Sequence, residues 1–285
     1  MNAPWQTAVE RQLNSEIVEK SRLGGGDFAE SYQALLSDGR NIFVKTHSNP
    51  PARFFTTEAK GLQWLSAADC VNVPTVLAYS DTPPFLALEW VSIGHRGSAS
   101  EQLFGQQLAQ LHQAGFDCFG RPDECSTGSQ AVPNAPCDSW VEFYATQRLL
   151  PLARKAFDAK ALSSRCIAQI EHIASILDTF EAADEPPALL HGDVWAGNRV
   201  VDQSGNSWLI DPAAHGGHRE FDLAMMRLFG GYDDTCFAAY NEHFPLQSDW
   251  QHRVALHQLA PLMVHAIKFG GAYRASTEQA VALYV

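Results

Sequence analysis

No apolar run in this sequence approaches the roughly 20 residues that a helix needs to cross a lipid bilayer. The N-terminal segment is polar and charged, and it lacks the apolar core of a signal peptide. Six cysteines are present, without a C-x-x-C pair and without the paired histidine spacing of a zinc site. These absences predict a cytoplasmic protein with no membrane partner, whose cysteines are mostly thiols.

Positive charge is also scarce. The chain has 20 Lys and Arg against 32 Asp and Glu, which gives a formal net charge of -12 at pH 7. Nucleic-acid-binding proteins need clustered basic residues against phosphate, so this balance argues against a nucleic-acid partner. A polyphosphate site in such a chain must create its own local positive field. With 285 residues and 46% hydrophobic content, the chain is long enough for two lobes that each have a core.

The first ninety residues predict a small antiparallel sheet with one main helix against it. Alternating apolar residues mark the strands, and apolar residues at helical spacing mark the helix. The expected elements are a short helix over 5–19, a hairpin with strands ending at 36 and covering 41–45, a helix over 53–67, and a strand pair over 73–79 and 85–91.

From about residue 98 the pattern is mainly helical, interrupted by a long loop and by short strands. The expected helices begin near 98, 139, 161 and 221, the loop covers 115–138, and the short strands lie near 191 and 208–211. We therefore predict an N-terminal lobe over 1–91 and a C-terminal lobe over 92–285. The resulting fold class is α+β with two lobes.

The strongest chemical signal is the stretch from His191 to Asn198, followed after a predicted hairpin by Asp211. Phosphoryl transfer needs a carboxylate that accepts or orients the proton of the attacking hydroxyl. It also needs oxygen ligands for the magnesium that neutralises the triphosphate. We assign Asp193 as the catalytic base, and Asn198 and Asp211 as the magnesium ligands. The competing interpretation is that these side chains only cap turns.

Two upstream residues fit the same chemistry. Lys45 ends a predicted strand, from which its ammonium can reach the α- and β-phosphates of ATP. Glu58 lies on the following helix, where it can pair with Lys45 and fix its position. The alternatives are a solvated lysine at a strand end and an exposed carboxylate on a helix surface.

The remaining nucleotide contacts are predicted from backbone groups. Gly24, Gly25 and Gly26 would let a hairpin turn approach phosphate closely. Glu89 and Val91, at the expected lobe junction, would offer backbone hydrogen bonds to adenine, and the alternative is a buried edge strand. The glycines match neither a P-loop nor a Rossmann motif, because no Gly-Lys-Ser/Thr and no helix follow them directly.

With these residues in place, the chain resembles the fructosamine kinase (ketosamine-3-kinase) family, within the wider group of aminoglycoside and choline kinases. The resemblance runs nearly end to end, and its most specific segment extends from Gly217 through Arg219-Glu220 and Asp222 to Tyr232. It implies a bilobal protein-kinase-like fold with a sheet-based N-lobe and a helical C-lobe. It also implies Mg-ATP, and phosphorylation of the 3-hydroxyl of a ketosamine, which reverses protein glycation.

The resemblance extends to the acceptor. The segment 264–270 keeps His265 and a Phe-Gly pair but lacks the Asn-His-x-Asn-His run of many members, and this region lies near where the family holds sugar. Trp195, just after Asp193, could stack on a sugar face or an amine, or could be a core residue. Asp27 stands where some relatives have a cysteine, so no disulfide-linked dimer is expected and a monomer is predicted.

Three other functions compete. Against a protein kinase stand Gly192, where kinases that are regulated through the activation loop have arginine, and Pro212 after Asp211. No activation segment fits between Asp211 and Asp222, and Asp222 is expected to have a structural role, anchoring the catalytic loop. An aminoglycoside or choline kinase is the nearer alternative, and the acidic charge would suit its cationic substrates. A non-catalytic pseudokinase is disfavoured because all five core positions of a kinase site are intact. These positions are Lys45, Glu58, Asp193, Asn198 and Asp211.

Overall fold

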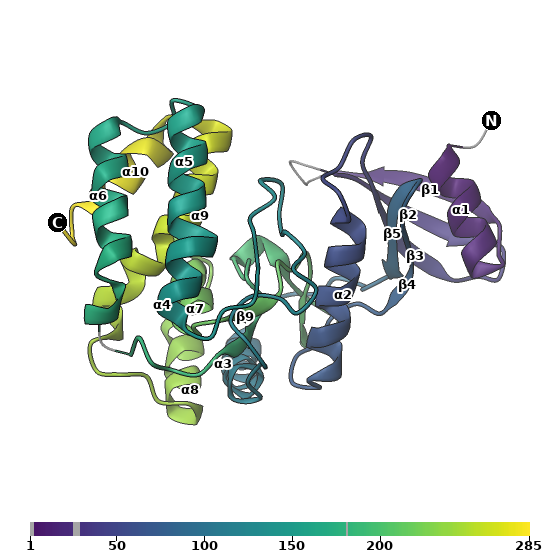
Figure 1. Ribbon diagram of the computed structural model, residues 1–285. Helices are drawn as coiled ribbons and strands as arrows, with labels where there is room; N and C mark the ends of the chain where they lie inside the picture. The colour runs from purple at the N-terminus through teal and green to yellow at the C-terminus, as the bar shows by residue number, and fades with distance from the viewer. Residues whose placement is uncertain (1–2, 25–28, 181) are drawn as a thin grey trace.

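The computed structural model describes residues 3–24, 29–180 and 182–285. Figure 1 shows a sheet with two helices at one end of the molecule and a bundle of helices at the other, with short strands between them. This arrangement confirms the predicted α+β class with two lobes. No helix among the described residues is long and apolar enough to cross a membrane. All six cysteines belong to the described residues, and each is a free thiol.

The N-lobe is built on a five-stranded antiparallel sheet with the strand order β1-β2-β3-β5-β4. The strands are β1 (Ile17–Leu23), β2 (Glu30–Leu36), β3 (Asn41–Thr46), β4 (Val76–Asp81) and β5 (Pro84–Glu89). Two helices accompany them, α1 (Pro4–Leu13) and α2 (Phe54–Ala67). All of these elements except α1 and β1 lie close to the predicted ranges.

The sheet buries both of its faces, each against one helix. On β3, Ile42 and Val44 join the core that contains α1, whereas the residue between them, Phe43, packs with the α2 side. Successive side chains of a strand point to opposite faces, so this alternation places one helix on each face of the sheet. Lys45 projects on the α2 side for the same reason.

The predicted helix over 5–19 is wrong in its second half. Helix α1 ends at Leu13, Asn14 adopts a left-handed conformation with φ 50°, and β1 begins at Ile17. Asparagine is one of the few residues that tolerate this conformation, and it commonly ends helices. Strand β1 lies at the sheet edge with Glu19, Lys20 and Ser21 exposed, so it lacks the apolar alternation that would have marked it as a strand.

The C-lobe is mainly helical. Its helices are α3 (Ser98–Gln113), α4 (Trp140–Phe143) continued by a π-helical turn (Tyr144–Leu149), α5 (Leu150–Asp158), α6 (Ser164–Ser175), α7 (Glu220–Leu228), α8 (Asp234–His243), α9 (Val254–Phe269) and α10 (Ala272–Val281). Two short antiparallel pairs lie among them: β6 (Ala188–Leu190) with β9 (His215–Gly217), and β7 (Arg199–Val201) with β8 (Ser207–Leu209). These pairs carry the predicted catalytic segments.

A buried arginine in the long loop connects the lobes. Arg121 donates hydrogen bonds to the carbonyl oxygen of Ala214 in the C-lobe at 2.6 Å and of Thr57 on α2 at 3.4 Å. The neighbouring Asp123 pairs with Lys60 of α2 at 3.2 Å. Helix α2 also packs closely here, since a Cβ added to Gly61 would lie 3.1 Å from the Cβ of Ala214. Helix α2 is therefore attached to the C-lobe as well as to its own sheet.

Candidate active site

The lobes meet at an ion pair network around Lys45. Its Nζ lies 2.9 Å from Oε1 of Glu58 on α2 and 2.5 Å from Oδ1 of Asp211 in the C-lobe. Both Lys45 and Glu58 are buried, each with 7% of its surface exposed. The alternatives of a solvated lysine and a surface glutamate are therefore wrong. Three of the predicted site residues, from stretches up to 166 positions apart, come together at one point.

This network keeps a positive charge in a buried place. Burial by itself would lower the pKa of Lys45, but the carboxylates of Asp211 and Glu58 outweigh it and hold this pKa above its ordinary value. The lysine is therefore an ammonium across the physiological pH range. The net acidic chain thus keeps one ammonium at the junction of its lobes, paired with two carboxylates.

Asp193 and Asn198 form a second contact. The amide nitrogen Nδ2 of Asn198 donates to Oδ2 and to the backbone carbonyl of Asp193, both at 2.9 Å. Asn198 ends a short 3₁₀-helix over Ala196–Asn198, which places it one turn after Asp193. Because its nitrogen faces Asp193, the amide oxygen of Asn198 remains as an acceptor for another group.

The contact of Lys45 with Asp211 and the contact of Asn198 with Asp193 are joined through Ile210, the residue before Asp211. The backbone N–H of Ile210 donates to the carbonyl of Asn198 at 2.9 Å. In the other direction, Nε2 of His191 lies 3.0 Å from the carbonyl of Ile210, and Nδ1 of His191 accepts from the backbone N–H of Asp193 at 3.2 Å. Burial lowers the pKa of His191, so the ring is neutral and can donate at one nitrogen while it accepts at the other.

Asp222 on α7 holds the start of the catalytic loop. Its two carboxylate oxygens accept from the backbone N–H of His191 at 2.8 Å and of Gly192 at 2.9 Å, and it is fully buried. Nε2 of His112 on α3 lies 3.4 Å from the same carboxylate. The expectation that Asp222 anchors the catalytic loop is confirmed, and His191 and His112 are supporting residues that the motifs did not assign.

The backbone at the loop explains the glycine after His191. Gly192 has φ +79°, and a Cβ on this residue would lie 2.4 Å from the carbonyl oxygen of Ala213. An arginine here, as in many protein kinases, would be disfavoured by the positive φ and would also clash with this carbonyl oxygen. Asp211 itself has φ 57°, an uncommon conformation for a non-glycine residue that is typically found at functional sites.

The environment of Asp193 suits a proton acceptor. Burial and the negative charge of Asp211 raise the pKa of Asp193 to about 8, and the hydrogen bond from Asn198 opposes this rise only in part. A carboxylate with a raised pKa holds a proton more tightly than a solvated one does. Proton transfer from a hydroxyl is favoured by a pKa near the working pH.

The oxygens of Asn198 and Asp211 fit a magnesium ion. Magnesium takes hard oxygen ligands, usually one or two from the protein, and completes its shell with phosphate oxygens and water. The amide oxygen of Asn198 and the carboxylate of Asp211 are such donors, and the Asp211 side chain is 39% exposed toward solvent. The donor set therefore has both the chemistry and the access that a nucleotide-bound magnesium needs.

We expect Asp222→Asn to lower both the stability and the turnover of the protein. The asparagine amide would present N–H groups to a backbone N–H that has lost its acceptor, and leaving such a buried group unpaired costs about 1–3 kcal/mol. The loop that carries Asp193 would then be less well placed, so kcat should fall about tenfold while the KM for ATP changes little.

Urea unfolding and steady-state kinetics measure these two effects. Asp158→Asn is the matched control, because Asp158 forms only an exposed pair with Arg154 at 3.1 Å and such pairs contribute little. Asp222→Asn with the stability and kcat of the control would show that Asp222 does not hold the loop.

The predicted nucleotide contacts are placed less completely. Gly24 directly follows β1 and has open space around it, whereas Gly25 and Gly26 lie outside the described residues. Glu89 ends β5, and it lines a cavity of about 300 Å³ together with Val91 and the β7–β8 turn. These residues do lie at the connection between the lobes, and their roles toward ATP remain predictions.

The predicted acceptor residues lie in one group of aromatic side chains. Trp195 is 39% exposed, so the interpretation as a buried core residue is wrong, and its ring centroid lies 5.8 Å from that of Phe229. The ring centroid of Phe229 in turn lies 5.1 Å from that of His265 on α9. Phe269 and Tyr273 complete the group, which the motifs did not identify beyond Trp195 and His265. Their spacing of four residues, 265-269-273, is the only signal that could have pointed to them.

Comparisons with known proteins identify the family to which the chain belongs. The whole chain, residues 1–285, matches the sequence model of the fructosamine kinase family. The mouse ketosamine-3-kinase is 30% identical over 95% of this chain and 97% of its own length. A crystal structure described as a fructosamine-3-kinase from Thermobifida fusca is 38% identical, covers 98% of both chains and superposes with a TM-score of 0.90.

The choline kinase of Streptococcus pneumoniae is far less similar in sequence, at 12% identity over 99% of both chains, with a TM-score of 0.66. That likeness shows a shared fold and no more. The full-length family match and relatives of 30% and 38% identity lead to a firm assignment: this chain belongs to the fructosamine kinase family.

Proposed function

We propose that the protein is an ATP-dependent kinase that phosphorylates the 3-hydroxyl of a ketosamine, and that it uses magnesium and acts as a monomer. The observation that carries this proposal is that the network of Lys45, Glu58 and Asp211 is linked to the Asn198–Asp193 pair through the backbone of Ile210. Membership of a family whose mouse relative is named for ketosamines supplies the class of acceptor.

In this function, each residue has one task. Lys45, positioned by Glu58, would bind α- and β-phosphate oxygens in place of its present contact with Asp211. Asn198 and Asp211 would hold the magnesium, which supplies positive charge to the phosphates. Asp193 would accept the proton of the acceptor hydroxyl and orient its oxygen for in-line attack on the γ-phosphoryl group.

The lobes divide this work. Residues 1–91 would bind the nucleotide through Lys45, the Gly24–Gly26 turn and the backbone at Glu89 and Val91. Residues 92–285 would supply the catalytic loop and the acceptor site, with Trp195 and His265 as contacts of the acceptor. An aminoglycoside or choline kinase shares the first part of this scheme, so the acceptor decides between the functions.

An acceptor panel tests the proposal. The protein would be offered Mg-ATP with ribuloselysine, fructoselysine, kanamycin or choline, and mass spectrometry would show which compound gains a phosphoryl group. We expect phosphorylation of the two ketosamines and not of kanamycin or choline. Phosphorylation of kanamycin or choline alone would contradict the proposed acceptor. If no compound gained a phosphoryl group and no ATP were hydrolysed, the kinase function itself would be contradicted.

A further inference from the structure

Five ring side chains form a continuous group, here called the aromatic patch, at one end of the candidate active site. They come from three places in the C-lobe: the catalytic loop, the end of α7, and the junction of α9 with α10. The members are Trp195, Phe229, His265, Phe269 and Tyr273. Neighbouring ring centroids lie 4.9 to 6.5 Å apart, which is the normal range for aromatic pairs.

Unlike the rings of the core, three members of the patch are open to solvent. Trp195 and Phe229 are each 39% exposed, and Phe269 is 49% exposed. Large apolar side chains that are exposed together usually mark a binding surface, because their exposure is unfavourable in a monomer without a ligand. We therefore expect the aromatic patch to bind a ligand with apolar surface.

The patch is continuous with the catalytic loop. Trp195 follows Asp193 by two residues, and its ring packs so closely on the backbone of Gly197 that a Cβ there would lie 2.2 Å from it. All five members belong to the C-lobe, whereas Lys45 approaches Asp211 from the N-lobe. An acceptor whose hydroxyl reaches Asp193 would thus have the nucleotide on one side and the patch on the other.

One charged residue borders the patch. Nζ of Lys268 lies 4.9 Å from the ring centroid of Phe269, within the range of a cation–π contact. Lys268 is exposed, and its ammonium also interacts electrostatically with the carboxylate of Asp193. No member of the patch is acidic, so the charge nearest to Phe269 is the ammonium of Lys268, which would attract a carboxylate on a ligand and repel an ammonium.

A ketosamine has two parts, a sugar with the reacting hydroxyl and a substituent joined through the amine. The sugar must lie at Asp193, so the substituent extends beyond it, away from the phosphates. On the basis of the proposed kinase function, we propose that the aromatic patch with Lys268 binds this amine substituent and favours apolar or carboxylate-bearing substituents over cationic ones.

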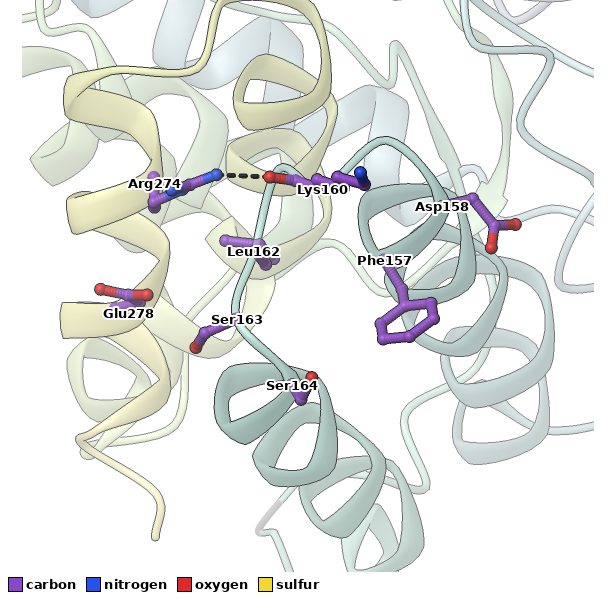
Figure 2. A pocket seen from close by; sticks show the side chains of 8 residues that line it. All are labelled: Phe157, Asp158, Lys160, Leu162, Ser163, Ser164, Arg274 and Glu278. Carbon is purple, nitrogen blue, oxygen red and sulfur yellow. Dashed lines mark hydrogen bonds between the residues drawn. The ribbon is translucent and has the colours of Figure 1, made fainter.

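The pocket in Figure 2 is not an alternative site for the substituent. It measures about 450 Å³ and lies between α5, α6 and α10, and its lining includes Phe157, Lys160 and Arg274 but none of the candidate catalytic residues. Figure 2 shows Arg274 bonded to the backbone carbonyl of Lys160, and it also donates to Ala161 at 2.6 Å. This pocket instead provides control residues, because Phe157 is 47% exposed and Lys160 is also exposed.

The test uses three ribulose adducts that differ at the end of the amine substituent. Adducts of β-alanine, n-propylamine and 1,3-diaminopropane end in a carboxylate, a methyl group and an ammonium. For the wild-type enzyme we expect kcat/KM to be about tenfold higher for the carboxylate adduct than for the ammonium adduct, with the methyl adduct between them. Lys268→Met should remove most of this difference, and the control Lys160→Met should keep it.

The aromatic part is tested with Phe269→Ala. It should raise the KM for all three adducts about fivefold, while the KM for ATP stays unchanged, because a stacking surface is lost on the acceptor side only. Phe157→Ala, at an equally exposed phenylalanine, should change neither constant. A KM for the adducts that is the same in Phe269→Ala and Phe157→Ala would overturn the aromatic part of the proposal.

The remaining outcomes are also distinguishable. A Lys268→Met variant that keeps the full preference for the carboxylate adduct would overturn the charge part. Turnover of all three adducts at one kcat/KM by the wild-type enzyme would overturn the selectivity while leaving the kinase function standing. Failure of the wild-type enzyme to phosphorylate any adduct would contradict the proposed function itself and this inference with it.

Discussion

Asp193→Asn is expected to lower kcat by at least about 10²-fold, the lower end of the contribution of a general base. The substitution keeps the size of the side chain but removes its capacity to accept a proton from the acceptor hydroxyl. Asn198 would still find an oxygen to which it can donate, so the loop should keep its shape. Because a general base acts in the transition state rather than in nucleotide binding, the proposed role of Asp193 predicts an affinity for ATP near that of the wild type.

Steady-state kinetics with a ketosamine, together with equilibrium binding of ATP, measures both parts of this prediction. Asp158→Asn again serves as the control for a change of aspartate to asparagine on a distant exposed surface. If Asp193→Asn keeps more than about a tenth of the wild-type kcat, the assignment of Asp193 as the base is wrong.

Lys45→Met is expected to lower kcat/KM for ATP by about 10²-fold, through a higher KM and a lower kcat together. Methionine approximates the length of the lysine side chain but removes the charge that would bind phosphate. It also leaves the buried Glu58 without its partner at 2.9 Å, and a broken buried ion pair typically costs about 3–5 kcal/mol of stability. Kinetics as a function of ATP and urea unfolding would separate the two effects.

Glu58→Gln tests the ion pair between Glu58 and Lys45 separately from the charge of Lys45, which this variant keeps. It leaves Lys45 and its contact with Asp211 in place, so its effect on kcat/KM should be smaller than that of Lys45→Met. The control for loss of a lysine is Lys160→Met, far from the lobe junction. Wild-type kinetics for Lys45→Met would remove this residue from the active site.

The five core positions could be found from sequence because their chemistry fixes both residue type and order. An Asp and an Asn five positions apart, followed by an Asp after a hairpin, satisfy a requirement for oxygen ligands that few other arrangements meet. The structure links this segment through Ile210, the residue before Asp211, whose backbone contacts both Asn198 and His191. Spacing along the chain was a sufficient guide for Asp193, Asn198 and Asp211, since these three residues lie within one short stretch.

Other features of the fold and the site could not be predicted from any pattern in the sequence around them. Strand β1 is an exposed edge strand, so hydrophobic alternation could not reveal it. Arg121 lies in a long loop without periodicity, and its partners Thr57 and Ala214 are known only from the three-dimensional arrangement. Phe269 and Tyr273 belong to different helices, separated at Gly270 and Gly271, so their spacing would have been read as one face of a single helix.

The attachment of α2 bears on how the activity can be controlled. Protein kinases are commonly switched by moving the helix that carries the glutamate partner of the lysine. Here an outward swing of α2 would have to break the contacts of Arg121 with Thr57 and of Lys60 with Asp123, and to separate Gly61 from Ala214. We therefore expect a permanently assembled enzyme with no resting off-state of the helix-out kind, whose flux follows the supply of its two substrates.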